Sequence, residues 1–203
     1  SFTTSLLTVG CTNENEISHE TVDQVKVDDI KEPIQEKFNQ TMALAEKGDA
    51  EAQYNLGWMY SNGEGVESDE TVTAQWFQKA ADQGHIKALY NLGVMYRDGV
   101  GVPQDDIKSA DYLLKAADQG YAPAQFNLGT LYFEGRGVPQ DDIKAADYFL
   151  KAADQGVADA QYNIGYMYYH GRGVAQDTNI AKEWLKKSAN QGFKAAQESL
   201  SAM

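Results

Sequence analysis

Tyr90-Asn91-Leu92-Gly93 is one copy of the motif that decides the fold of this 203-residue chain. The same positions read Tyr54-Asn55-Leu56-Gly57, Phe126-Asn127-Leu128-Gly129 and Tyr162-Asn163-Ile164-Gly165, each copy 36 residues from the next. A fixed period of this length indicates one supersecondary unit that is repeated and stacks on its own copies. The sequence therefore predicts a solenoid, whose long curved surface is typical of proteins that bind other macromolecules.

Each repeat is predicted to hold two helices joined by a tight loop. In the second copy, Ala88 and Leu92 follow helical spacing on an apolar stripe. Gly99-Val100-Gly101-Val102 ends this first helix, because glycine adopts the left-handed conformation that closes a helix. Asp105 stands at the N-cap of the second helix. Gly93 lies within the first helix, where glycine is unfavourable, so we expect a neighbouring helix to approach closely there.

The fold class is all-α, and the chain divides into a leader, a cap and repeats. We assign four repeats to residues 48–191, with the bounds 48–83, 84–119, 120–155 and 156–191. Residues 33–47 are an N-terminal capping helix, and residues 192–203 are a partial fifth repeat that forms the C-terminal cap helix. Residues 1–32 are polar and acidic beyond their first apolar run, which favours a flexible tether. The alternative for this segment is an irregular helix over Thr21 to Ile30.

These motifs resemble the Sel1-like repeat. The resemblance rests on the Leu-Gly pair, the Tyr96-x-x-Gly99-x-Gly101-Val102 loop, the Lys115-Ala116-Ala117 segment and the closing Gly120, in four consecutive copies. That family is related to the tetratricopeptide repeat. The resemblance implies a right-handed α-solenoid that serves as a protein-binding scaffold.

The run Leu6-Leu7-Thr8-Val9-Gly10-Cys11 resembles the lipobox of bacterial lipoproteins, although Thr8 stands where that family usually has leucine. The resemblance implies a signal remnant, cleavage before Cys11 and a lipid on its thiol. It also implies a periplasmic or outer-membrane-anchored lipoprotein of the bacterial envelope, touching the membrane only through this lipid. The alternative is an unmodified thiol near a frayed terminus.

Composition excludes several functional classes. The formal net charge is −13, which repels nucleic acid and anionic lipid surfaces. Cys11 is the single cysteine and cannot form an internal disulfide. No stretch approaches the run of about 20 apolar residues that spans a bilayer.

The positions that change from copy to copy on the first helices are candidates for partner binding. We expect a concave groove formed by Asn55, Trp58, Asn91, Arg97, Asn127, Phe133, Asn163, Tyr166, Tyr169 and His170. Exposed aromatic side chains and arginine are enriched in interface hot spots. Alternatively, Trp58 and Tyr166 pack on a neighbouring helix, and the asparagines bond the adjacent repeat instead of a bound peptide. The second-helix series of Trp76, Tyr112, Tyr148 and Trp184 is assigned to the core.

No chemistry-bearing motif stands out. The Gly-x-Gly loops lack a preceding strand and a Walker lysine, and the histidines lack metal-site spacing, so we expect no catalytic residue, metal or cofactor. The preferred function is a monomeric, non-catalytic scaffold that binds a protein partner, such as a basic toxin or an envelope protein. One alternative is an immunity protein that neutralises a secreted toxin such as a phospholipase. An alternative of another class is an enzyme acting on β-lactams or peptidoglycan.

Overall fold

The computed structural model describes residues 19–203, with side chains from residue 32 onward. This part of the chain contains ten helices and no strand, which confirms the all-α prediction. The helices are α1 His19–Glu46, α2 Ala50–Asn62, α3 Glu70–Asp82, α4 Ile86–Asp98, α5 Asp106–Asp118, α6 Ala122–Glu134, α7 Asp142–Asp154, α8 Ala158–His170, α9 Thr178–Asn190 and α10 Lys194–Ala202.

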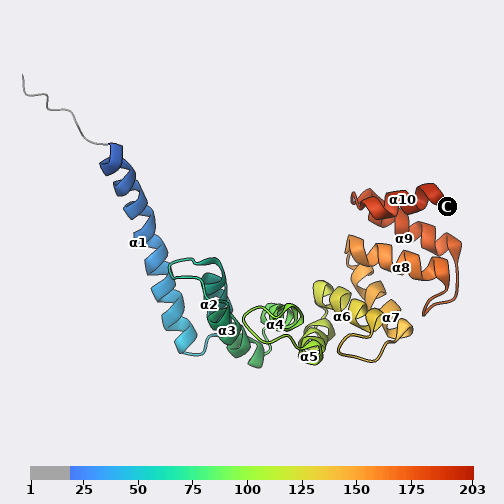
Figure 1. Cartoon of the computed structure of the whole chain (residues 1–203), viewed down its shortest axis with the longest axis horizontal. Coiled ribbons are helices and arrows are strands. Elements are labelled where there is room, and N and C mark those ends of the chain that lie inside the picture. The colour runs from blue at the N-terminus through green and yellow to red at the C-terminus, as the bar shows by residue number, and fades with distance from the viewer. Residues whose placement is uncertain (1–18) are drawn as a thin grey trace, which may run out of the picture.

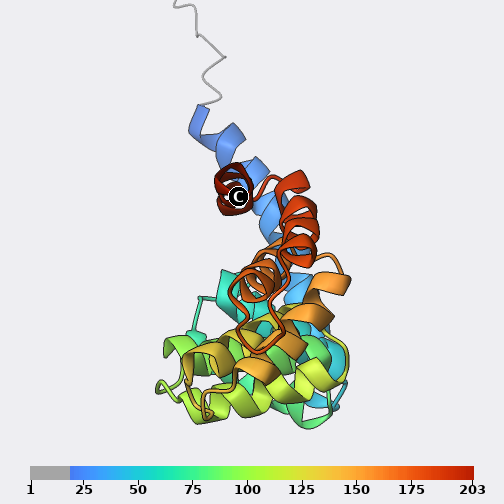
Figure 2. The ribbon, with the colours of Figure 1, turned by 90° about the vertical axis from the view of Figure 1, so that its right-hand side faces the viewer.

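The helices form a solenoid in which each helix packs against the next one along the chain. Every predicted repeat holds one pair, and we call α2, α4, α6 and α8 the A helices and α3, α5, α7 and α9 the B helices. In Figure 1 the chain forms an arc that opens upward, with α4 above α5 in its middle. Figure 2, turned by 90°, also shows both ends of the described chain rising from the middle repeats.

Local capping explains where each helix begins and ends. Asp105 Oδ1 accepts hydrogen bonds from the backbone N–H groups of Ile107 and Lys108, at 3.1 and 3.0 Å, and so caps α5. The equivalent aspartates of the other B helices are Asp69, Asp141 and Asp177. Gly99 follows α4 in the left-handed conformation, with a φ of 69°. The predicted N-caps and the helix-ending role of the first loop glycine are confirmed.

The glycine within each A helix allows the B helix of the same repeat to come close. A Cβ added at Gly93 would lie 2.7 Å from Leu113 Cγ, and one at Gly129 would lie 2.8 Å from Phe149 Cδ1. Leu113 and Phe149 are almost fully buried. The expected close approach is confirmed, since a larger residue would push the paired helices apart.

The second glycine of each loop joins one repeat to the next. An added Cβ at Gly101 would overlap the carbonyl oxygen of Glu70, at the start of the preceding B helix. An added Cβ at Gly137 would overlap the carbonyl oxygen of Asp106 in the same way, and one at Gly173 would overlap that of Asp142. The loop backbone therefore rests on the backbone of the repeat before it.

Glutamine side chains link the repeats at most junctions. We number the junctions by the repeats they join: the first lies between repeats 48–83 and 84–119, and the second and third follow. Gln125 Nε2 donates to Ala117 O at the second junction, and Gln161 Nε2 donates to Ala153 O at the third. At the first junction Leu89 takes this position and is buried. There, His85 stacks on Tyr54 instead, with ring centroids 4.5 Å apart.

The segment before the repeats differs from the prediction. α1 begins at His19 and continues through Pro33, so residues 19–32 are helical rather than a flexible tether. The alternative helix over Thr21 to Ile30 lies within α1. A proline removes one backbone hydrogen bond and bends a helix without always ending it, and for this reason Pro33 was a poor boundary. The lipobox-like run and Cys11 lie outside the described residues.

The aromatic series on the B helices is structural, but these residues lie at the edge of the core, and the prediction that they lie within it was wrong. Its members are half-buried. Tyr112 stacks on Tyr96 with ring centroids 5.6 Å apart, and its hydroxyl donates to Gln78 Oε1 of the preceding repeat. Lys79 Nζ lies 3.6 Å from the centroid of the Trp76 ring. These rings pack on the core and still reach polar groups, as amphipathic aromatic side chains do.

None of the helices between residues 19 and 203 has both the length and the apolar character needed to cross a membrane.

Candidate functional site

The predicted groove residues all lie on A helices, and we call their shared surface the A-helix face. Three of its aromatic side chains are among the large hydrophobic residues that remain exposed in the described chain: Trp58 at 41%, Tyr166 at 39% and Tyr169 at 39%. Buried packing positions alternate with these exposed ones along each A helix. The A-helix face therefore presents apolar rings to solvent without weakening the core beneath them.

Two neighbouring pockets hollow the C-terminal half of this face. The Phe133 pocket has a volume of about 220 Å³ and is lined mainly by Thr130, Phe133, Glu134, Phe149, Asn163 and Tyr166. The Tyr169 pocket has a volume of about 240 Å³ and is lined mainly by Tyr166, Tyr169, His170, Leu185, Ser199 and Met203. Tyr166 lines both pockets and separates them.

The two pockets are the same pocket in successive repeats. Tyr166, Tyr169 and His170 stand 36 residues after Thr130, Phe133 and Glu134. Leu185 and Ser199 likewise correspond to Phe149 and Asn163. The solenoid therefore repeats a cavity along its A-helix face, with different side chains around it.

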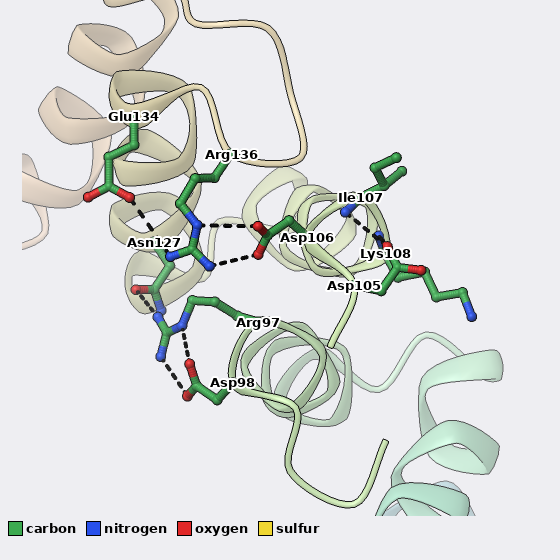
Figure 3. A network of polar contacts seen from close by, with 9 residues as sticks. All are labelled: Arg97, Asp98, Asp105, Asp106, Ile107, Lys108, Asn127, Glu134 and Arg136. Atoms are coloured by element: carbon green, nitrogen blue, oxygen red, sulfur yellow. Dashed lines mark hydrogen bonds and ion pairs between the residues drawn. The ribbon is translucent and has the colours of Figure 1, made fainter. Parts of the chain in front are cut away.

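In the second repeat, Arg97 fills the equivalent place. Its Nε and Nη2 donate to the two carboxylate oxygens of Asp98 at 2.8 and 3.0 Å, and its Nη1 donates to Asn127 Oδ1 at 3.3 Å. Figure 3 shows the guanidinium held between these two side chains. Asp98 and Asn127 correspond by position to Glu134 and Asn163 of the Phe133 pocket.

The hydrogen bonds between Arg97 and Asp98 shift the pKa of both residues in the expected directions. Hydrogen bonding to Asp98 raises the pKa of Arg97, and the same contact lowers the pKa of the Asp98 carboxyl below its usual value. Charge-assisted, bidentate pairs of this kind are the stronger hydrogen bonds in proteins. Arg97 is therefore occupied within the molecule, unlike the free groove residue that the sequence suggested.

In the first repeat, Trp58 covers the equivalent place. Its ring meets Phe77, which corresponds to Phe149, edge-on at a centroid distance of 6.2 Å, and meets Tyr54 at 6.4 Å. Trp58 thus packs on the neighbouring helix, as the alternative interpretation held, while keeping an exposed edge.

The repeated asparagines differ in their contacts. Asn127 bonds the adjacent repeat, because it accepts from Arg97 and its Nδ2 donates to the Tyr90 hydroxyl at 3.3 Å. Asn55, Asn91 and Asn163 make no side-chain hydrogen bond to other described residues. Asn163 lines the Phe133 pocket, so its amide is available there.

Sequence analysis missed a pair of charged contacts between repeats. Arg136 forms a bidentate pair with Asp106 across the second junction, and Arg172 forms one with Asp142 across the third. The signal was present, since both arginines and both aspartates recur at the 36-residue period. The Arg172 guanidinium also lies 4.0 Å from the centroid of the Phe133 ring, so it supports one wall of the Phe133 pocket.

The site offers binding groups of two kinds: aromatic rings and hydrogen-bonding side chains. Among residues 19–203, no three His, Cys, Asp or Glu side chains gather as a metal site would need. An apolar cavity with a few polar groups at its rim fixes and orients a bound group.

The helix pairs, the loop contacts and the repeated cavity define a repeat scaffold of the α-solenoid class. The model of the Sel1 repeat family matches residues 50–85, 86–121, 122–157 and 158–193, and the chain belongs to this family. No match was found among curated proteins.

Two solved structures are similar over most of the chain. A protective antigen of uropathogenic Escherichia coli with an SLR fold is 40% identical, with a TM-score of 0.79, over 82% of this chain and 36% of its own. A Sel1 repeat protein from Oxalobacter formigenes is 39% identical, with a TM-score of 0.76, over 83% of this chain and 49% of its own. This chain thus spans between a third and a half of the length of these relatives.

An immunity protein from Pseudomonas aeruginosa is 29% identical over 81% of this chain and 61% of its own, with a TM-score of 0.49.

Proposed function

We propose that this chain is a non-catalytic scaffold that binds a protein partner on its A-helix face. The observation that carries the proposal is the pair of open pockets one repeat apart, separated by the exposed ring of Tyr166. Exposed tyrosine and tryptophan rings beside pockets are typical anchors of protein interfaces. The tight packing below the face gives the anchors a rigid base, which lowers the entropy cost of binding.

Site-specific cross-linking tests this proposal. A photo-reactive amino acid placed at Tyr166 should cross-link a partner protein in cells of the native organism. The same group at the exposed Gln75, on B helix α3, serves as the control position and should not. Equal cross-linking from both positions would contradict binding on the A-helix face.

The double variant Trp58→Ala, Tyr166→Ala provides a second test. It should weaken capture of the cross-linked partner while leaving the helical circular dichroism signal unchanged, because neither side chain is fully buried. Undiminished capture would contradict the proposal.

We further propose that the scaffold acts at the bacterial envelope, anchored by a lipid on Cys11. The lipobox-like run before Cys11 supports this location. Mass spectrometry of the N-terminal peptide from native cells should find a diacylglyceryl group on the Cys11 thiol. An unmodified Cys11 within an uncleaved chain would contradict it.

A narrower form of the proposal is an immunity protein that neutralises a basic toxin. The formal charge of −13 supports it, because an acidic surface speeds association with a basic partner. Co-expression with the product of a neighbouring toxin-like reading frame should restore growth. If the toxin kills equally with and without the chain, this form is wrong and the general scaffold stands.

A further inference from the structure

We propose that the Phe133 pocket accepts an arginine side chain of an extended peptide, and that the Tyr169 pocket accepts an apolar side chain of the same peptide. This inference rests on the proposed function, since it names the class of partner that the A-helix face would bind. Its basis is a comparison of the side chains that stand at equivalent positions in the other repeats.

The second repeat shows which group fits the Phe133 pocket. At that place the protein inserts its own guanidinium, from Arg97, between the Asp98 carboxylate and the Asn127 amide oxygen. In the third repeat, Phe133 replaces the arginine, while Glu134 and Asn163 keep the carboxylate and the amide. The acceptors for a guanidinium are thus retained where the internal guanidinium is missing.

The aromatic walls favour the same ligand. Tyr166 is exposed beside the Phe133 pocket, and planar guanidinium groups stack well on aromatic faces. The molecule already uses this contact, because Arg172 lies over the Phe133 ring.

The charges around the Phe133 pocket are compatible with a bound cation. Arg136 Nη1 lies 4.0 Å from Glu134 Oε2, but its guanidinium is committed to Asp106 through a bidentate pair (Figure 3). Arg172 is similarly paired with Asp142. Each nearby cation has its own carboxylate, so Glu134 remains to balance an incoming charge.

The Tyr169 pocket lacks these acceptors. His170 and Ser199 stand where the Phe133 pocket has Glu134 and Asn163. The His170 ring packs against Tyr166 and Tyr169, with centroid distances of 4.2 and 5.0 Å. A cavity with aromatic walls and no acidic side chain favours an apolar side chain.

The spacing of the pockets selects an extended ligand. Both pockets share the Tyr166 ring as a wall, so their occupants lie on either side of one side chain. A polyproline II segment is extended and returns to the same face every third residue. The two anchors should therefore lie within a few positions of each other in the peptide.

Selection from a random nonapeptide library displayed on phage tests the inference with the whole chain as bait. The selected peptides should carry an arginine within a few positions of an apolar residue, at one preferred interval. Replacing this arginine by citrulline, its neutral isostere, should weaken binding of the synthetic peptide at least about tenfold, because the positive charge that strengthens the hydrogen bonds to Glu134 is lost.

Two variants of the chain test the pocket itself. Glu134→Gln should weaken the arginine peptide at least about tenfold, and Phe133→Arg should do the same by restoring an internal guanidinium. Asp154→Asn, an exposed acid at the end of α7, is the matched control and should leave binding unchanged. Thermal unfolding of each variant checks that the fold is intact.

The outcomes separate this inference from the proposed function. If the selected peptides lose binding in Tyr166→Ala but show no arginine preference, or tolerate Glu134→Gln, the inference is wrong and the scaffold proposal stands. If no sequence is enriched, the inference is wrong, and the scaffold proposal is decided by the cross-linking test. If peptide binding is insensitive to Tyr166→Ala, both are contradicted.

Discussion

The first two repeats and the last two share one backbone design but differ in what covers their A-helix face. In the first two, Trp58 packs on Phe77, and Arg97 is bonded to Asp98 and Asn127. In the last two, the cavity is open and bordered by Tyr166 and Tyr169. The repeats therefore differ at a few positions of the A helices, and on our proposal these positions decide which repeats bind the partner.

The two regions also differ at their junctions. The second and third junctions repeat the same glutamine link and the same arginine–aspartate pair. At the first junction, Leu89 and Val100 take the positions of the glutamine and the arginine. The N-terminal repeat is therefore joined by other contacts, including a hydrogen bond between the Tyr112 hydroxyl and Gln78.

The largest expected effect tests the shared backbone. Gly101→Ala and Gly137→Ala should each lower the free energy of unfolding by about 3 kcal/mol or more, because the new Cβ overlaps a carbonyl of the preceding repeat. The control Gly84→Ala has a similar positive φ but open space around it, and should cost about 1–2 kcal/mol. Urea unfolding measures all three. A loss at Gly101 no larger than at Gly84 would show that the first junction is built differently.

Alanine substitution of the two exposed rings separates packing from binding. Trp58→Ala should lower the free energy of unfolding by about 1–2 kcal/mol, because the ring covers Phe77 and Tyr54. Tyr166→Ala should lower it by less than about 1 kcal/mol. It should, however, weaken peptide binding at least about tenfold, since the ring lines both pockets. If Tyr166→Ala lowered the free energy of unfolding more than Trp58→Ala did, and weakened peptide binding less, the proposed difference between the first two and the last two repeats would be contradicted.

The charged pair at the second junction should have a small effect. Arg136→Met should lower the free energy of unfolding by about 0.5–1 kcal/mol, since the pair with Asp106 is partly exposed. Val100→Arg places an arginine opposite Glu70, as at the other two junctions, and should raise the free energy of unfolding by about 0.5 kcal/mol at most. Both effects should shrink in 1 M salt. A salt-independent change would point to packing rather than charge.

The smallest effect concerns the titration of Asp98. Its pKa is lowered by Arg97, so the folded chain binds this proton less readily than the unfolded chain. The associated stability is therefore present above the ordinary carboxyl pKa of about 4 and is lost as pH falls through the lower folded value. Carbon-13 NMR of the Asp98 carboxyl should show its midpoint rising in Arg97→Met. An unchanged midpoint would mean that Arg97 does not hold this carboxylate.

The periodic features of the molecule could be predicted from sequence. The 36-residue spacing gave the helix pairs, Asp105 gave an N-cap, and Gly93 indicated close helix packing, because each has one dominant local cause. The start of α1 could not be predicted, since a polar segment can form a helix or remain disordered, and Pro33 lies inside α1 instead of marking its start.

The candidate site was predicted only in outline. The exposed rings of Trp58, Tyr166 and Tyr169 follow from their variation between copies. That Arg97 turns inward and binds Asn127 depends on the distance between two A helices, which no local pattern contains. The two pockets likewise could not be predicted from a local pattern, because they form where no long side chain fills the space between neighbouring repeats.

The contact of Gly101, Gly137 and Gly173 with the preceding repeat affects how the solenoid could select a ligand by the distance between its anchors. Because main chain meets main chain at these points, the pitch of the solenoid does not depend on which side chains line its face. The interval between the two cavities is therefore set by the backbone, and a ligand with anchors at another interval would have to bend or leave one cavity empty. The solenoid would then discriminate between ligands by the distance between their anchors as well as by their chemistry.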